Sequence, residues 1–359
     1  MGNENPKKKE GNAMRVKAVQ IAREMGISKA TVSLALNNKP GVSKKTKREI
    51  LLCRERLENE TAKERRETSA PKKGIIKVIV ATRGLRIALD SEMDLWTDVL
   101  AVFEQEAKRR GYLTGITYID VRVESIDKLA DACNGEDISG VVLQATELYE
   151  EDISKFEKIR HPMVIYDNES TDLIHNCVVA DNFLGVERAV NWLFRRNYKD
   201  IIYLAHDIEI YNFRQRRKGF CGAFLEHNQN PYQPGRIVEA GATIENVYHK
   251  MNHYLDSHGL PEAFIMENYQ VTIGTMRALK ERRIAVPEQV ALIGIDALPS
   301  YMTGDCELTA VRIPHTERAV LVIMLLEKEI AEQSGTKSRV MTDCRLVEGM
   351  SVKSKYNRK

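Results

Sequence analysis

The side chains in this chain with the clearest capacity for chemistry lie in one short stretch near the N-terminus. Lys29, Ser33 and Asn37 recur every fourth residue, so a helix would present them on one face. Such groups form hydrogen bonds with base edges and phosphates. Ala30 and Leu34 lie beside them, and their methyl groups suit contact with thymine methyls. The stretch predicts a helix that reads double-stranded DNA, although an ordinary helical hairpin would show the same spacing.

Two helices separated by a glycine must position this face. Ala18, Ile21, Ala22 and Met25 recur at helical spacing and predict a first amphipathic helix, which Gly26 ends.

The second helix is predicted to begin after Ser28, which stands at an N-cap position. Its inward stripe is Val32, Ala35 and Leu36. A helix, a tight turn and a second helix with polar and methyl groups outward is a shape that a major groove admits.

A third helix follows a turn at Pro40-Gly41. Ser43 is its predicted cap, and its predicted apolar side is Ile50, Leu51 and Leu57. Three short helices of this kind can close a small core.

The runs 27–37 and 41–46 resemble the LacI/GalR family of bacterial transcription regulators. The resemblance implies an N-terminal helix-turn-helix domain followed by a two-lobed, periplasmic-binding-protein-like α/β domain. It also implies contacts to operator DNA from the following residues: Ser28, Lys29, Ala30, Thr31, Ser33, Leu34, Asn37 and Lys44.

Charge is divided unevenly along the 359 residues. Residues 1–73 hold 19 Lys and Arg against nine Asp and Glu, whereas the remainder holds 35 against 42. A basic front end on an acidic body indicates that the front end meets a polyanion. A hydrophobic content of 43% and the lack of a long apolar run or a signal peptide predict a soluble, cytoplasmic protein.

Composition also suggests the domain boundaries. Residues 1–14 are polar and are expected to be disordered, 15–58 form the helical headpiece, and 59–74 contain no large apolar side chain and are interpreted as a linker. Within that linker we expect Arg65 and Arg66 to contact phosphates. Pro71 should end any helix there by about Ala70.

After residue 74, short apolar runs alternate with amphipathic segments. This rhythm predicts two doubly wound parallel sheets, hence two lobes with a cleft between them. We expect an N-lobe of about 75–169 and 311–337 and a C-lobe of about 170–310 and 338–353. That the chain crosses back between the lobes is implied by the resemblance alone.

Four strand-end or helix positions match ligand-contacting positions of the family: Asp167, Arg214, Asn268 and Asp296. They could bind a polyhydroxylated effector such as a carbohydrate, although each strand-end Asp or Asn could instead cap the next helix. Tyr269 stands where many relatives carry Asp, which places a simple hexose in question.

Other chemistry finds no support in the sequence. It contains no glycine-rich phosphate loop, no metal-binding histidine pattern and no catalytic motif, so neither a cofactor nor an enzyme activity is expected. The six cysteines are scattered, with no Cys-x-x-Cys pair.

Together, the predicted DNA-reading helix and the predicted two-lobed domain lead us to expect a ligand-responsive regulator, most simply a repressor, that binds a pseudo-palindromic operator as a homodimer. The alternatives are a two-lobed solute-binding protein without a DNA-binding role and an enzyme that kept the cleft.

Overall fold

A computed structural model describes residues 18–37, 39–69, 73–84, 95–169, 174–303, 306–332 and 335–355. The disorder expected for residues 1–14 lies outside these ranges. The described chain divides into a helical unit within Met1–Lys72 and a larger unit of two sheets, and each is described by itself.

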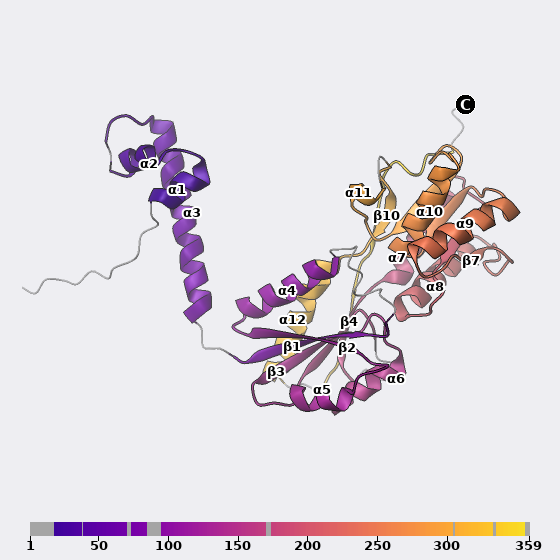
Figure 1. The fold of residues 1–359 in the computed structure, drawn as a ribbon, viewed down its shortest axis with the longest axis horizontal. Helices are drawn as coiled ribbons and strands as arrows, with labels where there is room; N and C mark the ends of the chain where they lie inside the picture. The colour runs from indigo at the N-terminus through magenta and orange to yellow at the C-terminus, as the bar shows by residue number, and fades with distance from the viewer. Residues whose placement is uncertain are drawn as a thin grey trace, which may run out of the picture. The chain divides into compact units, whose positions relative to one another are not determined.

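The helical unit has the three expected helices (Figure 1). They are α1 (Ala18–Met25), α2 (Lys29–Leu36) and α3 (Lys44–Ser69). Gly26 ends α1 with a φ of +64°, in the left-handed region that favours glycine. The buried core of this unit consists of Ile21, Ala22, Val32, Ala35 and Ile50. The inward stripes predicted for α1 and α2 therefore meet as expected.

The apolar side of α3 differs from the expectation at one position. Leu51 is 37% exposed, whereas Cys53 and Leu57 pack against the core with Ile50. The reason is helical phase, because a residue one step from Ile50 turns about 100° away from the core face, whereas residues three and seven steps away return to it.

The expected linker is largely helical. Instead of stopping near residue 58, α3 continues to Ser69. The segment is rich in Glu, Lys, Arg and Ala, which are good helix formers even without an apolar face. The helix ends where Pro71 led us to expect.

Two six-stranded sheets form the larger unit, in the orders β2-β1-β3-β4-β5-β11 and β7-β6-β8-β9-β10-β12. The first sheet contains β1 (Ile75–Thr82), β2 (Leu113–Asp120), β3 (Ile138–Gln144), β4 (Met163–Tyr166), β5 (Asn176–Ala180) and β11 (Arg339–Thr342). The second contains β6 (Ile201–Ala205), β7 (Ile237–Glu239), β8 (Ala263–Met266), β9 (Ala291–Ile295), β10 (Thr309–Arg312) and β12 (Arg345–Val347). Neighbouring strands are parallel except β10 and β12, which pair antiparallel.

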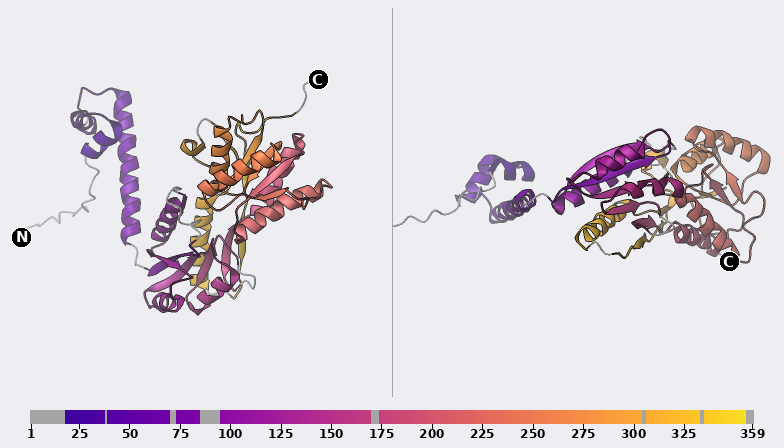
Figure 2. Two further views of the ribbon diagram at one scale, coloured as in Figure 1. Left: turned by 45° about the vertical axis from the view of Figure 1, so that its right-hand side comes forward. Right: turned by 90° about the horizontal axis from the view of Figure 1, so that it is seen from below.

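Helices cover both faces of each sheet, which explains why the central strands are continuous apolar runs (Figures 1 and 2). On the first sheet, α4 (Leu95–Arg109) and α12 (His315–Glu332) cover one face. The other face is covered by α5 (Ile126–Cys133), α6 (Glu150–Ile153) and the 3₁₀ helix η1 (Ser154–Lys158). On the second sheet, α7 (Asn182–Arg195) and α8 (Tyr211–Glu226) lie opposite α9 (Ile244–His258) and α10 (Tyr269–Glu281). A short helix, α11 (Ser300–Thr303), follows β9.

The chain crosses between the sheets after β5, after β10 and after β11. The discontinuous lobes implied by the resemblance are therefore confirmed. Two crossings run side by side, since the Asp181 amide donates to the Thr342 carbonyl at 2.9 Å. Gly185 is required there, because a Cβ on it would lie 2.7 Å from the Cβ of Cys344.

The lobe boundaries differ from those we expected. Both β5 and β11 belong to the first sheet, so the first crossing comes after Ala180 rather than near residue 170. Similarly, β10 lies wholly in the second sheet, and the segment 339–347 is two strands in different sheets. A sequence marks a buried strand by its apolar residues, but the pairing partner is decided by the tertiary fold.

Candidate functional site

The α2 helix is held by its N-cap and by two buried side chains. The Ser28 hydroxyl accepts from the Thr31 amide at 3.1 Å, as predicted for a cap. Val32 and Ala35 are buried against α1 and α3, with 0% and 2% of their surfaces exposed. These contacts fix which face of α2 points outward.

The outward face carries the residues that the sequence singled out. Lys29, Ala30 and Ser33 are exposed, and Leu34 is half-buried. Asn37 caps the C-terminus of the helix, with its Nδ2 donating to the Ser33 carbonyl at 2.9 Å. One face of α2 thus offers an ammonium group, a hydroxyl, an amide and methyl groups, which is a surface suited to base edges.

Three basic candidates lie in α3, which contains Lys44, Arg65 and Arg66. Their side chains are outside the described part of the structure.

A second polar cluster lies at the carboxyl ends of the central strands. In sheets with this strand order, ligands bind at the carboxyl ends, where the direction of chain winding reverses. Asp167 and Asp296 each follow a central strand and have positive φ values of 67° and 76°. Left-handed backbone at a non-glycine residue is unfavourable and often marks a functional site.

Asp167 is held on every side. Its carboxylate forms an ion pair with Arg318 and accepts from the Thr146 hydroxyl at 2.6 Å and from Asn212 Nδ2 at 3.0 Å. Because Asn212 lies on α8 of the second lobe, this last bond joins the two lobes. Burial alone would raise the pKa of Asp167, but Arg318 and the hydrogen bonds outweigh it and lower that pKa.

Asp296 connects to the same cluster through His315. Arg318 Nη2 lies 2.9 Å from His315 Nδ1, and because a guanidinium can only donate, Nδ1 must accept. The ring proton therefore sits on Nε2, which donates to the Asp296 carboxylate at 2.8 Å. Burial opposes the charge on Asp296, but His315, Arg216 and Arg318 lower its pKa overall.

The arginine of α8 that enters the cluster is Arg216, not Arg214. Arg214 is exposed, whereas Arg216 is only 5% exposed. Its Nε donates to Asn182 Oδ1 and its Nη1 donates to the Glu267 carbonyl, both at 2.7 Å. Arg214 and Arg216 are two residues apart on α8, and two residues correspond to a turn of about 200° around the helix axis. The two side chains therefore point to nearly opposite sides, and the arginine expected from the sequence is the one that faces away from the cluster.

Asn268 and Tyr269 follow β8 at the start of α10. The Asn268 side chain caps that helix by accepting from the Val271 amide at 3.0 Å, so the capping alternative applies to it. Tyr269 is 7% exposed, and its hydroxyl is buried without a hydrogen-bond partner. The structure thus gathers Asp167 and Asp296 into one network, with Asn268 and Tyr269 beside Glu267.

Sequence reasoning missed five members of this cluster: Thr146, Asn212, Arg216, His315 and Arg318. His315 and Arg318 stand three residues apart at the start of the last long helix, which places them on one face. Nothing in the sequence shows that this face meets the end of β4.

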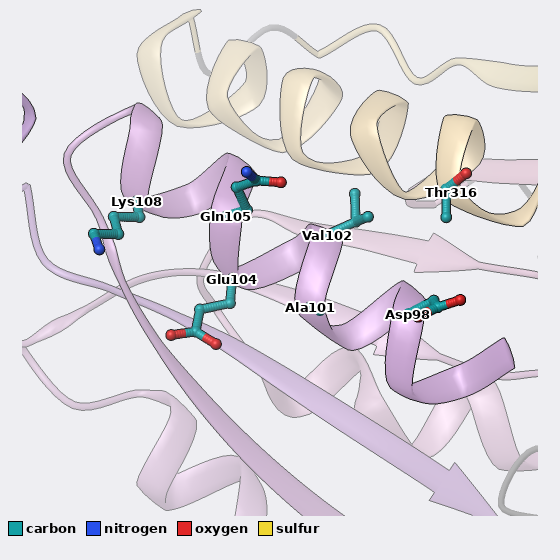
Figure 3. A pocket seen from close by; sticks show the side chains of 7 residues that line it. All are labelled: Asp98, Ala101, Val102, Glu104, Gln105, Lys108 and Thr316. Atoms are coloured by element: carbon teal, nitrogen blue, oxygen red, sulfur yellow. The ribbon is translucent and has the colours of Figure 1, made fainter. Parts of the chain in front are cut away.

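A surface groove of about 500 Å³ runs along α4 and shares no lining residue with the cluster (Figure 3). It is lined by Asp98, Ala101, Val102, Glu104, Gln105, Lys108 and Thr316. In the described part of the chain, no group of three His, Cys, Asp or Glu side chains could hold a metal ion. Nor does any helix described there have the length and apolarity to span a bilayer.

Comparison with known proteins agrees with both halves of this architecture. Residues 19–57 match the family model of bacterial regulatory proteins of the lacI family, and residues 190–352 match a periplasmic binding protein-like domain. The repressor PurR of Histophilus somni is 25% identical over 320 residues, which cover 87% of this chain and 92% of that protein. PurR of Pasteurella multocida is 23% identical over 340 residues, covering 93% and 98%.

Solved structures share the fold at lower identity. The regulator CelR in complex with cellobiose has a TM-score of 0.67 at 18% identity and covers 94% of this chain and 100% of its own. The lac repressor dimer bound to operator and the anti-inducer ONPF has a TM-score of 0.66 at 17% identity and covers 94% and 99%. This chain therefore combines a LacI-type helix-turn-helix domain with a periplasmic-binding-protein-like domain of two parallel sheets, and it is similar over most of its length to LacI-type repressors.

Proposed function

We propose that the protein is a repressor that binds a pseudo-palindromic operator as a homodimer and responds to a small molecule held between its lobes. The observation that carries the DNA-binding part is the face of α2, where Lys29, Ala30 and Ser33 are exposed while Val32 and Ala35 are buried. One such helix reaches only a few base pairs, so two copies related by a two-fold axis are needed to read a longer site.

In this proposal, α2 reads bases and flanking groups hold phosphates. Lys29, Ser33 and Asn37 form hydrogen bonds in the major groove, while Ala30 and Leu34 contact thymine methyls. Phosphate contacts come from residues at the ends of α2 and in α3: Ser28, Thr31, Lys44, Arg65 and Arg66. A protein working on genomic DNA in this way acts in the cytoplasm.

The effector site in the proposal is the cleft that contains Asp167, Asp296, Asn268 and Tyr269, with Arg216 in the role first expected for Arg214. The bond from Asn212 to Asp167 supports this choice, since it spans the lobes and would respond to a change in their separation. A ligand that binds one lobe arrangement better shifts the equilibrium toward it, and the helical unit senses the shift.

The main alternative is a solute-binding protein without DNA-binding activity. A gel-shift assay with genomic fragments separates the two functions, because only a regulator retains a defined fragment against excess random DNA. Binding should weaken with salt, at a log–log slope of roughly −5 to −9 if about six to ten phosphates are neutralised per dimer. This scale is borrowed from lac repressor, whose structure is similar to that of this chain. Failure to retain any genomic fragment would contradict the proposal.

A further inference from the structure

The chain enters the first sheet through Lys73 and Gly74, directly before β1. The Ser139 hydroxyl donates to the Lys73 carbonyl at 2.7 Å, and the Leu113 amide donates to the Gly74 carbonyl at 2.9 Å. Gly74 has a φ of +112°, and a Cβ on it would lie 2.2 Å from Ser139 Oγ. The backbone that follows the linker is therefore fixed to the starts of β2 and β3.

The Lys73 side chain reaches α12, the helix whose first turn belongs to the cleft cluster. Lys73 Nζ donates to Glu327 Oε1 at 3.0 Å and lies 5.2 Å from the centroid of the Tyr112 ring. The Lys73 and Glu327 side chains are 50% and 32% exposed. Because exposed ion pairs add little to stability, this contact can break and form again without unfolding of the domain.

The start of α12 is bonded to both lobes. Arg318 forms its ion pair with Asp167, which follows β4 of the first sheet. His315 donates to Asp296, which follows β9 of the second sheet, at 2.8 Å. A change in the separation of the lobes therefore acts directly on this end of the helix.

Between its two ends, α12 packs closely on the first sheet. A Cβ on Gly140 of β3 would lie 3.0 Å from Leu326 Cδ1, and Gly140 directly follows Ser139, which holds the Lys73 carbonyl. Apolar side chains along the helix are 0% exposed: Ala319, Val322, Ile323 and Leu326. Close-packed elements transmit displacement because they deform little. A displacement at the start of α12 should therefore reach Glu327.

We propose that α12 couples the cleft to the linker, and that the ion pair of Glu327 with Lys73 is the contact through which it does so. When the lobes change their separation, His315 displaces the start of α12, and Glu327 then shifts Lys73 just before β1. The path of the linker out of the sheet thus depends on the state of the cleft. Lys73 and Glu327 are positioning residues in this account. The inference goes beyond the proposed function and rests on its DNA-binding part.

A double-mutant cycle tests this coupling and needs no identified effector. The probe is a genomic fragment that the wild type retains in gel shifts, and the readout is its Kd. His315→Gln perturbs the cleft end of α12, Glu327→Gln removes the charge at the linker end, and a third variant combines them. These positions are about 18 Å apart along the helix, at 1.5 Å per residue. Unconnected substitutions at that distance should have effects on Kd that multiply to within about twofold.

We expect the double variant to depart from that product by at least about fivefold, because the change at His315 no longer reaches Lys73. Charge reversal gives a second measure. In Glu327→Lys and in Lys73→Glu, like charges meet, and the effect of His315→Gln on Kd should shrink. The exchange of both charges should restore that effect. A direct action of either charge on DNA cancels, because each background serves as its own reference.

The matched control is Asp127→Asn. It breaks an exposed ion pair with Lys158 on the opposite face of the same sheet, so the effect of His315→Gln should stay as in the wild type. Thermal unfolding shows that each variant is folded. If His315→Gln is not folded, Asp296→Asn takes its place, since it weakens the same bond from the other lobe.

Two results overturn the inference alone, in a wild type that retains a fragment. One is a cycle whose effects multiply to within about twofold, as well-separated independent sites do. The other is a cleft-end variant with the Kd of the wild type. A wild type that retains no genomic fragment contradicts the proposed function and the inference together.

Discussion

Arg318 at the start of α12 and Asp167 after β4 form a buried ion pair, with side chains 0% and 7% exposed, across 151 positions of sequence. Arg318 also lies over the Tyr166 ring, 4.7 Å from its centroid. The pair ties the last long helix to the end of β4 in the first sheet. It therefore occupies a carboxylate that the sequence suggested for ligand.

Breaking this pair should destabilise the protein strongly. Arg318→Leu leaves the Asp167 carboxylate buried without its counter-charge, and the free energy of unfolding should fall by roughly 3–5 kcal/mol. Urea unfolding measures the change. The control is Arg188→Leu, whose partner is Asp343 and whose side chain is 46% exposed, and it should cost below about 1 kcal/mol. Equal losses of unfolding free energy in the two variants would show that the buried pair stabilises the protein no more than an exposed pair does.

His175 should make stability depend on pH in a definite window. Burial lowers the pKa of His175 from 6.5 to about 4, and its Nε2 is buried without a partner. A lowered folded pKa means that the unfolded chain binds more protons between these values. The contribution of neutral His175 to the free energy of unfolding is therefore complete above pH 6.5, and it is lost as the pH falls toward 4.

The measurement compares wild type with His175→Gln. Because the pKa of His175 is lowered, the difference between the unfolding free energies of these two proteins should change by on the order of 2–3 kcal/mol between pH 6.5 and pH 4. The exposed His253→Gln serves as the control and should run parallel to the wild type. If His175→Gln keeps the wild-type pH dependence, another group is responsible for it.

Substitutions on α2 should reduce discrimination between operator and random DNA. Leu34→Ala and Lys29→Ala remove groups from the outward face without touching the buried Val32. Each should reduce discrimination by roughly 1–3 kcal/mol in competition gel shifts. Lys250→Ala, on α9 in the other unit, should leave discrimination unchanged. If the ratio of operator affinity to random-DNA affinity is unaltered in both α2 variants, this helix does not read the bases.

The operator should be bent only slightly. The resemblance to the LacI/GalR family implies a hinge helix with a leucine that wedges into the minor groove, and counting forward from the headpiece places Thr68 at that position. Although α3 extends to Ser69, a threonine lacks the apolar bulk that offsets base unstacking. Circular-permutation gel shifts should therefore show little bending, and Thr68→Leu should increase it. A sharp kink at the operator centre with the wild type would contradict this account.

The sequence by itself determined the first two helices of the helical unit, the start of the third, and the alternation of strands and helices that follows. Local signals specify such elements: Ser28 caps α2, Gly26 adopts a positive φ, and Val32 and Ala35 repeat at helical spacing. The run Ile75–Thr82 is rich in β-branched residues, which is typical of a strand buried on both faces, and it forms β1.

Only the tertiary structure decided which strands pair and which side chains meet. It placed β5 and β11 in the first sheet and brought Arg318 onto Asp167, contacts that span well over a hundred residues. It also chose Arg216 over Arg214, since burial depends on the neighbours of α8 and not on its own sequence. Local propensity and spacing act over a few residues, whereas such contacts are selected by the packing of the whole unit.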